Sequence, residues 1–153
     1  MPLSPDYQAM FEQLASAEPM PPLWEMTPEQ GREMYRAARP VITELAVGQI
    51  DNQIIQSSDA EIPIRIYYPD GEGPFGTLLY FHGGGWVIGD LDTGDAVCRE
   101  MSTLANVVVV SVDYRMAPEA IYPAAVDDSY AALEWVEKKQ SSAKRQWQNR
   151  RDG

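Results

Sequence analysis

Hydrophobic residues near the N-terminus recur at the spacing of amphipathic helices. A first helix is predicted to begin at Pro5, because proline favours the first helical position and Ser4 can cap it. Its apolar face would comprise Tyr7, Met10, Phe11 and Leu14. A capping-box pattern at residues 27–30 predicts a second helix that ends near Arg39, before a proline. The proline-rich stretch between the two helices predicts a connector.

After the second helix, the pattern changes to strands and helices in alternation. Strands are predicted over residues 49–56 and 62–68, and two continuous apolar runs, 77–81 and 106–112, predict strands buried on both faces. An apolar helical stripe follows each of these two runs, formed by Val97, Met101 and Leu104 and by Val126, Tyr130 and Leu133. This order predicts an α/β fold in which a mostly parallel sheet is flanked by helices.

Length, charge and cysteine content narrow the class of protein. A chain of 153 residues suggests one domain with a substantial core, and a net charge of −11 argues against a nucleic-acid partner. No apolar run is long enough to span a bilayer, and the N-terminus lacks the pattern of a secretory signal. Because Cys98 is the only cysteine, we expect a cytoplasmic protein without a disulfide or a metal site. No cofactor is expected either.

A glycine-rich loop after the first buried strand carries the clearest chemical signature. It reads His82-Gly83-Gly84-Gly85-Trp86 and precedes a predicted helix. Consecutive glycines let backbone N–H groups converge on one point, as in an oxyanion hole for acyl transfer. A flexible loop without chemistry is the alternative. A phosphate-binding loop is excluded, because no Gly-Lys-Ser/Thr follows and no G-x-G-x-x-G register fits.

A second motif, D-Y-R-M-A-P-E at residues 113–119, directly follows the second buried strand. The two motifs in this order resemble the hormone-sensitive-lipase-like branch of the α/β-hydrolases, a family of carboxylesterases and lipases. The resemblance covers about residues 45–139. It implies that residues 46–140 form the N-terminal part of an α/β-hydrolase core. Residues 1–45 would form a helical cap region over the acyl pocket.

The resemblance also implies a role for each residue of the glycine-rich loop. Gly84 and Gly85 would donate the N–H groups of the oxyanion hole, and Gly83 would shape its turn. His82 would position the loop and is not the family's general base. Trp86 would line the acyl or the alcohol side of the pocket.

The second motif would have a structural role. Its charged residues Asp113, Arg115 and Glu119 would hold the end of the strand beside the glycine-rich loop, although ordinary surface ion pairs are the alternative. Two peptide bonds, Ala117-Pro118 and Tyr122-Pro123, are candidates for the cis form, because the chain must turn sharply there.

The rest of the family's catalytic machinery does not occur in these 153 residues. The reaction needs a serine on a G-x-S-x-G turn, then an acid and then a histidine. No G-x-S-x-G is present, and the single histidine, His82, precedes the place of all three. Ser102, Ser111 and Ser129 fall on a predicted helix or strand and are interpreted as local hydrogen-bonding residues. The sequence therefore predicts an oxyanion hole without nucleophile, acid or base.

Residues 141–153 differ from the rest because they are basic and have no hydrophobic period, so the preceding helix is predicted to end near residue 140. A plain basic terminus is one interpretation. However, codons for residues 146–153 can be chosen so that reading one base later gives N-G-K-I-A-V-M-G, then Asp or Glu. Those residues would form a turn, a buried strand and the opening of the nucleophile motif. We therefore expect a one-base frameshift near residues 140–141.

Three functions remain open at this point. The chain is the N-terminal half of a carboxylesterase acting on small acyl esters, a non-catalytic homologue that binds small molecules, or a non-functional truncated product. The family's sheet order places beside residues 77–81 a further strand that this sequence lacks. We therefore expect self-association through an exposed apolar sheet edge at residues 78–81.

Overall fold

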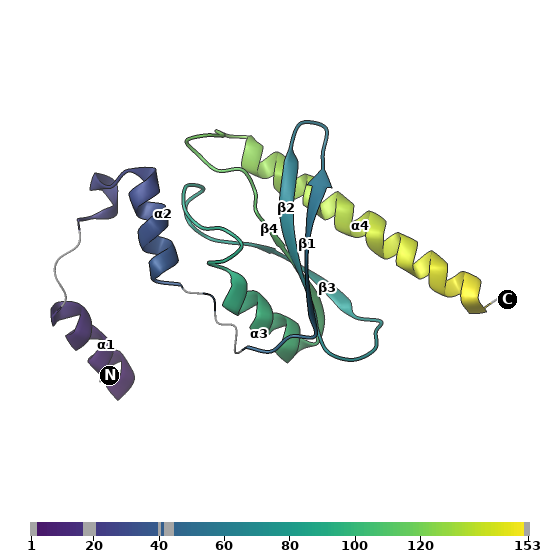
Figure 1. Cartoon of the computed structure of the whole chain (residues 1–153), viewed down its shortest axis with the longest axis horizontal. Helices are drawn as coiled ribbons and strands as arrows, with labels where there is room; N and C mark the ends of the chain where they lie inside the picture. Colours follow the sequence, from purple (N-terminus) through teal and green to yellow (C-terminus); the bar gives the residue numbers. More distant parts are fainter. Residues whose placement is uncertain (1–2, 17–20, 40, 42–44, 152–153) are drawn as a thin grey trace.

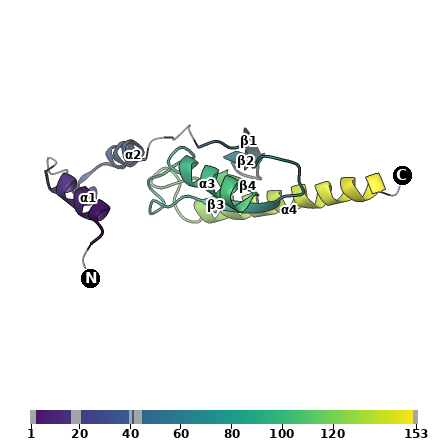
Figure 2. The ribbon, with the colours of Figure 1, turned by 90° about the horizontal axis from the view of Figure 1, so that it is seen from below.

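A four-stranded sheet lies between two helices in the computed structural model, which describes residues 3–16, 21–39, 41 and 45–151 (Figure 1). The strands are β1 (Gln49–Gln56), β2 (Glu61–Tyr68), β3 (Gly76–Phe81) and β4 (Val107–Val112). Helix α3 (Asp95–Ala105) packs on one face of the sheet and α4 (Ala124–Arg151) on the other (Figure 2). Before the sheet come α1 (Pro5–Ser16), the short 3-10 helix η1 (Leu23–Glu25) and α2 (Pro28–Ala37).

The strands lie in the order β1-β2-β4-β3. β3 and β4 pair in parallel, from Gly76 opposite Val107 to Phe81 opposite Val112, with α3 as the connection between them. This pairing confirms the predicted α/β core. β1 and β2 are joined by a short turn at residues 57–60 and pair antiparallel, because a tight hairpin can only join antiparallel strands. β2 is also antiparallel to β4, so the described sheet is mixed instead of mostly parallel.

Two apolar clusters fix the helices to the sheet. The cluster on the α4 side is centred on β2 and β4, where Ile64 and Val112 are fully buried against Ala132. The cluster on the α3 side contains Tyr67, Cys98 and Val109, also fully buried. Neighbouring residues of one strand, such as Val109 and Val110, therefore contribute to opposite faces, as expected for a strand covered on both sides.

The two helices occupy the predicted positions, but the predicted apolar stripes are not their buried faces. Most of the residues that face the sheet are small or polar, namely Asp95, Cys98 and Ser102 from α3 and Asp128 and Ala132 from α4, together with Val136 of α4. Of the two predicted stripes, Met101 does pack against the core. The exposed residues include Val97, Leu104, Val126, Tyr130 and Leu133. Hydrogen bonds satisfy the buried polar groups, as when the Ser102 hydroxyl donates to the Val107 carbonyl oxygen at 2.9 Å. Hydrophobic period alone therefore predicted the wrong face.

Helix α4 continues past residue 140 to Arg151, whereas the sequence predicted that helical order would be lost there. Ala, Gln, Lys and Arg are strong helix formers, so intrinsic propensity prolongs the helix where the apolar period is missing. Although α4 is long, no helix in the described part of the chain is both long and apolar enough to cross a membrane.

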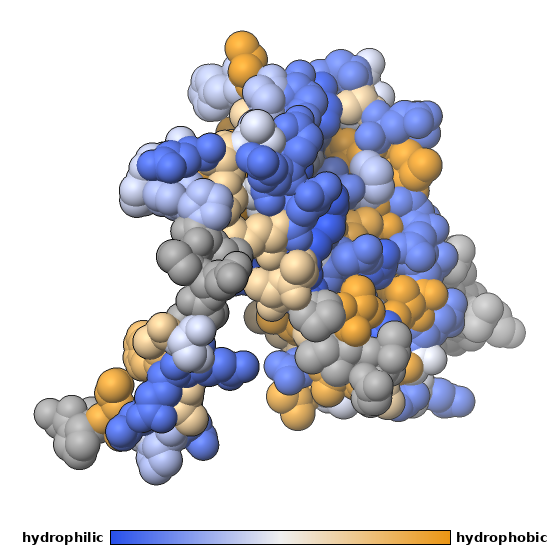
Figure 3. Space-filling view, turned by 60° about the vertical axis from the view of Figure 1, so that its left-hand side comes forward, coloured by the Kyte–Doolittle hydropathy of each residue, from blue (hydrophilic) through white to orange (hydrophobic). Residues whose placement is uncertain are grey.

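Helix α1 lies apart from the sheet, and both ribbon views show it beyond α2 (Figures 1 and 2). The predicted proline start is confirmed, and the Ser4 carbonyl accepts the N–H of Gln8 at 3.0 Å. The side chains of Tyr7, Met10 and Phe11 are exposed, so α1 forms a projecting lobe with apolar groups on its surface (Figure 3).

The thiol of Cys98 provides a test of the packing between α3 and the sheet. Cys98 is fully buried, and burial raises the pKa of its thiol to about 11. Disulfide reagents react with the thiolate, so at pH 8 we expect Ellman's reagent to label the folded chain roughly 100-fold more slowly than the urea-unfolded chain. Equal labelling rates in the two states would show that α3 does not pack on the sheet in solution.

Candidate active site

The two sequence motifs meet at one edge of the sheet. The glycine-rich loop follows β3 and the D-Y-R-M-A-P-E segment follows β4, and the two strands are parallel, so both segments leave the sheet at the same end. The N–H of Ala117 donates to the carbonyl oxygen of Trp86 at 2.8 Å, which joins the two segments directly. Motifs that lie far apart in the sequence therefore build one site.

The glycine-rich loop folds into a tight turn over residues 84–88. The carbonyl oxygen of Gly84 accepts the N–H groups of Val87 at 3.2 Å and Ile88 at 3.0 Å. Gly84, Gly85 and Trp86 have φ angles of 141°, 61° and 60°, in the region that favours glycine. A Cβ atom on Gly84 would lie 1.8 Å from the Ile88 carbonyl oxygen, so this turn can form only with glycine there.

Two N–H groups of this turn are available to a ligand. Within the described residues, the backbone N–H groups of Gly84 and Gly85 donate no hydrogen bond. Adjacent free N–H groups next to a strand end are what an oxyanion hole requires, because each can donate to the same developing negative charge. Both N–H groups predicted as donors are thus without a partner in the described structure.

His82 lies beneath the loop and is almost completely buried. Its ring stacks on Tyr114, with ring centres 4.5 Å apart, and its Nδ1 atom lies 3.1 Å from the Gly83 carbonyl oxygen. The Tyr114 hydroxyl donates to the His82 carbonyl oxygen at 2.6 Å. A Cβ atom on Gly89 would lie 2.3 Å from Nδ1, so Gly89 leaves the room that the imidazole occupies. These contacts fix the start of the loop, which is consistent with the positioning role predicted for His82.

Trp86 lies at the mouth of an apolar cavity. Its side chain is 66% exposed and borders a space of ≈ 530 Å³. The other lining residues are Gly85, Arg115, Ala117, Ala120, Tyr122, Pro123, Ala125 and Val126. Ala117-Pro118 and Tyr122-Pro123, which shape this wall, are both cis, as predicted, and Gly73-Pro74 is a third cis bond that the sequence analysis did not identify. The cavity opens beside Gly85 and suits an apolar group of a bound molecule.

A smaller cavity lies on the other side of Gly85, between the glycine-rich loop and the N-terminal helices. It measures ≈ 250 Å³ and is lined by Leu23, Met26, Thr27, Pro28, Gly31, Gly84, Gly85, Val87 and Ile88. The predicted capping box places α2 here: the Thr27 hydroxyl accepts the Gln30 N–H, and the Gln30 side chain accepts the Thr27 N–H. The free N–H groups therefore stand between two cavities.

Arg115 of the second motif is held by a carboxylate on α4. Its guanidinium donates to Asp128, with the shortest contact 2.7 Å long, and its backbone N–H also donates to Asp128 at 2.8 Å. Asp128 is fully buried. Because a buried carboxylate with both charge and hydrogen bonds satisfied resists displacement, this pair fixes the segment after β4 to the start of α4.

Glu119 is paired with Arg32 of α2 through two bonds of 2.7 and 2.8 Å. Hydrogen bonds from Arg32 lower the pKa of the Glu119 carboxyl to about 2, so the carboxylate stays ionised at every pH where esters are normally assayed. The other acidic residue of the motif, Asp113, behaves differently, since burial raises the pKa of its carboxyl. Its backbone N–H donates to the Pro63 carbonyl oxygen at 2.9 Å and continues the pairing between β4 and β2.

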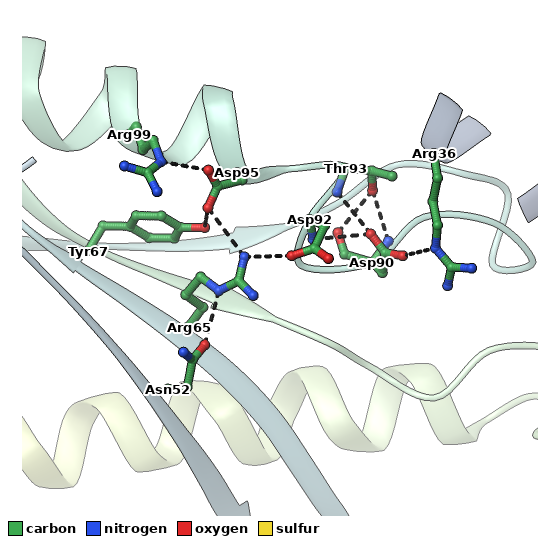
Figure 4. Close-up of polar contacts among 9 residues, drawn as sticks. All are labelled: Arg36, Asn52, Arg65, Tyr67, Asp90, Asp92, Thr93, Asp95 and Arg99. Carbon is green, nitrogen blue, oxygen red and sulfur yellow. Dashed lines mark hydrogen bonds and ion pairs between the residues drawn. The ribbon is translucent and has the colours of Figure 1, made fainter. Parts of the chain in front are cut away.

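A group of charged residues holds the segment between the glycine-rich loop and α3 (Figure 4). The buried carboxylate of Asp95 accepts hydrogen bonds from Tyr67 at 2.8 Å, Arg99 at 2.6 Å and Arg65 at 3.2 Å. Arg65 also donates to Asp92 at 2.8 Å. These bonds attach the start of α3 to β2, and they thereby restrain the C-terminal end of the segment that follows the glycine-rich loop.

The three serines considered as nucleophiles, Ser102, Ser111 and Ser129, lie in helices and strands of the core. Ser102 and Ser129 donate to backbone carbonyl oxygens, Ser129 to that of Ala125 at 2.7 Å, as predicted. Ser111 differs from the prediction: its buried hydroxyl has no hydrogen-bond partner among the described residues. The single histidine, His82, is buried and stacks on Tyr114, and no serine is among its polar contacts in the described structure.

Three residues of the site escaped the sequence analysis, namely Arg32, Tyr114 and Asp128. Tyr114 stands inside a motif, which was the one available signal. Arg32 lies on a helix whose charged residues look like a solvated face, and Asp128 sits beside another aspartate at the start of a helix, where acidic residues are common. Their importance comes from contacts with distant segments, which periodicity does not reveal.

Comparison with known proteins agrees with this geometry. The profile of a family described as the alpha/beta hydrolase fold matches residues 78–151. Esterase LipI of Mycobacterium tuberculosis is 48% identical over 103 residues, covering 64% of this chain and 31% of that protein. The arylesterase of Saccharolobus solfataricus is 33% identical over 140 residues, covering 89% of this chain and 44% of that protein.

A solved structure resembles most of this chain. A hyperthermophilic esterase from the archaeon Pyrobaculum calidifontis superimposes with a TM-score of 0.78 at 36% identity, covering 89% of this chain and 44% of that structure. The chain thus spans less than half the length of these relatives.

Proposed function

The chain belongs to the hormone-sensitive-lipase-like family of α/β-hydrolase carboxylesterases, and we propose that it supplies the oxyanion-hole part of an enzyme that hydrolyses small carboxylic esters. The observation that carries this proposal is the pair of free N–H groups on Gly84 and Gly85, held at the end of β3 between two cavities. Family membership supports ester hydrolysis as the class of reaction. The geometry of the glycine-rich loop supports stabilisation of the oxyanion as the contribution of this chain.

In the proposed reaction a serine hydroxyl attacks the ester carbonyl carbon while a histidine takes its proton. The carbonyl oxygen becomes an anion and accepts the N–H groups of Gly84 and Gly85, which lowers the barrier. Collapse releases the alcohol, and water then hydrolyses the acyl-enzyme by the same route. Serine, acid and base all come from residues other than these 153, since this sequence has no G-x-S-x-G and no histidine after His82.

The frameshift hypothesis provides the source of those residues. We propose that shifting the reading frame by one base near residues 140–141 extends the core into the strand and turn that carry the serine; we call that longer protein the extended form. Sequencing the coding DNA beyond residue 153 tests this directly. The shifted frame should encode G-x-S-x-G at once, followed by an aspartate or glutamate and then a histidine.

A small-molecule receptor is the second candidate, because the described chain has an apolar cavity beside Trp86. A shifted frame that continues the fold but lacks the serine or the histidine would favour this receptor over the esterase. A frame that stops at once would leave a non-functional product. The cytoplasmic location expected from the sequence remains a prediction.

We propose further that the 153-residue chain associates with itself. β3 pairs only with β4 in the described sheet, and Phe81 is exposed at that edge, while Leu133 is exposed on α4. Open strand edges and apolar patches favour association. Light scattering should therefore find oligomer or aggregate, and Phe81→Lys should shift the chain toward monomer more than Leu133→Lys. A monodisperse monomer with a cooperative thermal transition would contradict this expectation.

A further inference from the structure

Arg32 connects the N-terminal helices to both motifs of the candidate active site. It lies on α2, and its Nε atom donates to the carbonyl oxygen of Val87 at 2.8 Å. One terminal nitrogen donates to the carbonyl oxygen of Ala117 at 3.0 Å and to Glu119 at 2.8 Å. The side chain is only 17% exposed, so these bonds are made away from most of the competing solvent.

The bond to Val87 matters because it holds the turn that carries the free N–H groups. Within residues 84–88, the Gly84 carbonyl is bonded inside the turn, the Trp86 carbonyl is bonded to Ala117, and the Val87 carbonyl is bonded to Arg32. Each bond restrains the rotation of one peptide plane. Gly84 and Gly85 have little intrinsic rigidity, so external bonds set the direction in which their N–H groups point.

The backbone of α2 also packs closely against the turn. Gly31 is buried, and a Cβ atom placed on it would lie 3.5 Å from the Ile88 side chain. Helix α2 thus contacts the turn directly, through packing at Gly31 and through the hydrogen bonds of Arg32.

Arg36, one helical turn further along α2, offers a natural control. It pairs with Asp90, which lies after the turn, and its side chain is 56% exposed. It contributes to the docking of α2 and makes no hydrogen bond with residues 84–88 in the described structure. Asp90 itself accepts the N–H of Thr93 at 2.8 Å and so belongs to the anchored segment (Figure 4).

We infer that Arg32 is a positioning residue for the oxyanion hole: by bonding the carbonyl groups of Val87 and Ala117, it couples the docking of α2 to the direction of the Gly84 and Gly85 N–H groups. Arg32 does not touch the substrate in this role. The effect of Arg32 on catalysis rests on the proposed function. Its restraint of the turn rests on the hydrogen bonds alone.

The structural part is tested in the 153-residue chain, without catalysis. Hydrogen exchange should be measured at the N–H groups of Val87, Ile88 and Ala117, all bonded in or to the turn. In Arg32→Met these groups should exchange about tenfold faster or more, and in Arg36→Gln they should keep wild-type rates. Equal acceleration by the two variants would mean that Arg32 only docks the helix, and would overturn the inference.

The catalytic part is tested in the extended form. Arg32→Met should lower kcat roughly 10- to 100-fold with little change in KM, because misplaced donors weaken binding of the transition state more than of the substrate. The affinity for a trifluoromethyl ketone inhibitor should fall by the same factor as kcat/KM. Arg36→Gln should stay within about twofold of wild type.

Two conservative variants separate the carbonyl bonds from the ion pair. Arg32→Lys keeps the charge but cannot reach three acceptors, so it should recover only part of kcat. Glu119→Gln removes the ion pair and leaves the carbonyl bonds, so it should lower kcat by less than about threefold. If Glu119→Gln is as damaging as Arg32→Met, the carbonyl bonds are not the cause and the inference is wrong. If the wild-type extended form and all of its variants fail to hydrolyse esters, the proposed function is wrong. The hydrogen-exchange rates of the 153-residue chain would still show whether Arg32 holds the turn at residues 84–88.

Discussion

The purified 153-residue chain should not hydrolyse p-nitrophenyl acetate above the buffer rate, whereas the extended form should. We propose that the chain supplies the donors for an oxyanion, but among the described residues no serine is hydrogen-bonded to the single histidine, and a serine hydroxyl alone is a weak nucleophile. Paraoxon, which modifies activated serines, should abolish the activity of the extended form. The difference in rate between the two proteins is the largest effect expected from this structure.

Contaminating host esterases are the main hazard of that measurement. Gly84→Ala in the 153-residue chain provides the control, because activity that belongs to a contaminant will not respond to the substitution. Hydrolysis by the short chain that is lost in Gly84→Ala would instead show that residues 1–153 contain a nucleophile of their own, which would contradict the proposed function.

Gly84→Ala should be the most damaging single-methyl change in the extended form. The added Cβ would lie 1.8 Å from the Ile88 carbonyl oxygen and 2.6 Å from its carbon, at a φ of 141°, so the turn must open. Because displacing an oxyanion donor costs about 10²- to 10³-fold in kcat, we expect a loss of at least that size. The melting temperature of the variant should fall as well, since the backbone conformation is strained.

Gly83→Ala is the matched comparison in the same loop, and it tests the turn-shaping role that the family resemblance implied for Gly83, because the structure shows no steric need for glycine at this position. A Cβ atom on Gly83 would meet nothing within 4 Å, so the turn has room for it. We expect a kcat within about threefold of wild type and an unchanged melting temperature, measured by circular dichroism. Equal losses in Gly83→Ala and Gly84→Ala would indicate that flexibility of the loop, and not the shape of the turn, is what the glycines provide.

The elements of this fold could be predicted where a local rule governs them. The capping box at Thr27 formed as expected, and the two apolar runs became β3 and β4 within one residue of the predicted bounds. Capping patterns and buried runs are properties of a few neighbouring residues, so a single sequence contains them. The cis bonds before Pro118 and Pro123 were predicted from the sharp turn that the chain must make after the second buried strand.

The orientation of the helices could not be predicted in the same way. Periodicity assigned Val126 and Leu133 to one apolar face of α4, yet both are exposed, and the buried residues include Asp128 and Ala132. Asp128 is buried because Arg115, thirteen positions earlier in the chain, neutralises it. A hydrophobicity pattern treats an aspartate as a solvent-facing residue, because the pattern has no knowledge of the partner.

In the candidate site, too, local motifs could be predicted from the sequence, whereas contacts between distant segments could not. The glycines and His82 were identified from their motif, but the bonds that hold them in place come from Arg32 and Tyr114. Arg32 and Val87 are separated by 55 positions, and only the docking of α2 brings them together. The sequence therefore predicted candidate groups, whose catalytic roles stay a proposal, and the structure was needed to find the residues that hold them in place.

The most direct test of this account is a crystal structure of the extended form carrying a phosphonate on its serine. The phosphonyl oxygen stands in for the oxyanion of the reaction. We predict that it lies about 2.7–3.1 Å from the backbone nitrogens of both Gly84 and Gly85, with the turn at residues 84–88 unchanged. An adduct whose oxygen is bound by other donors, with these two N–H groups directed elsewhere, would contradict the account.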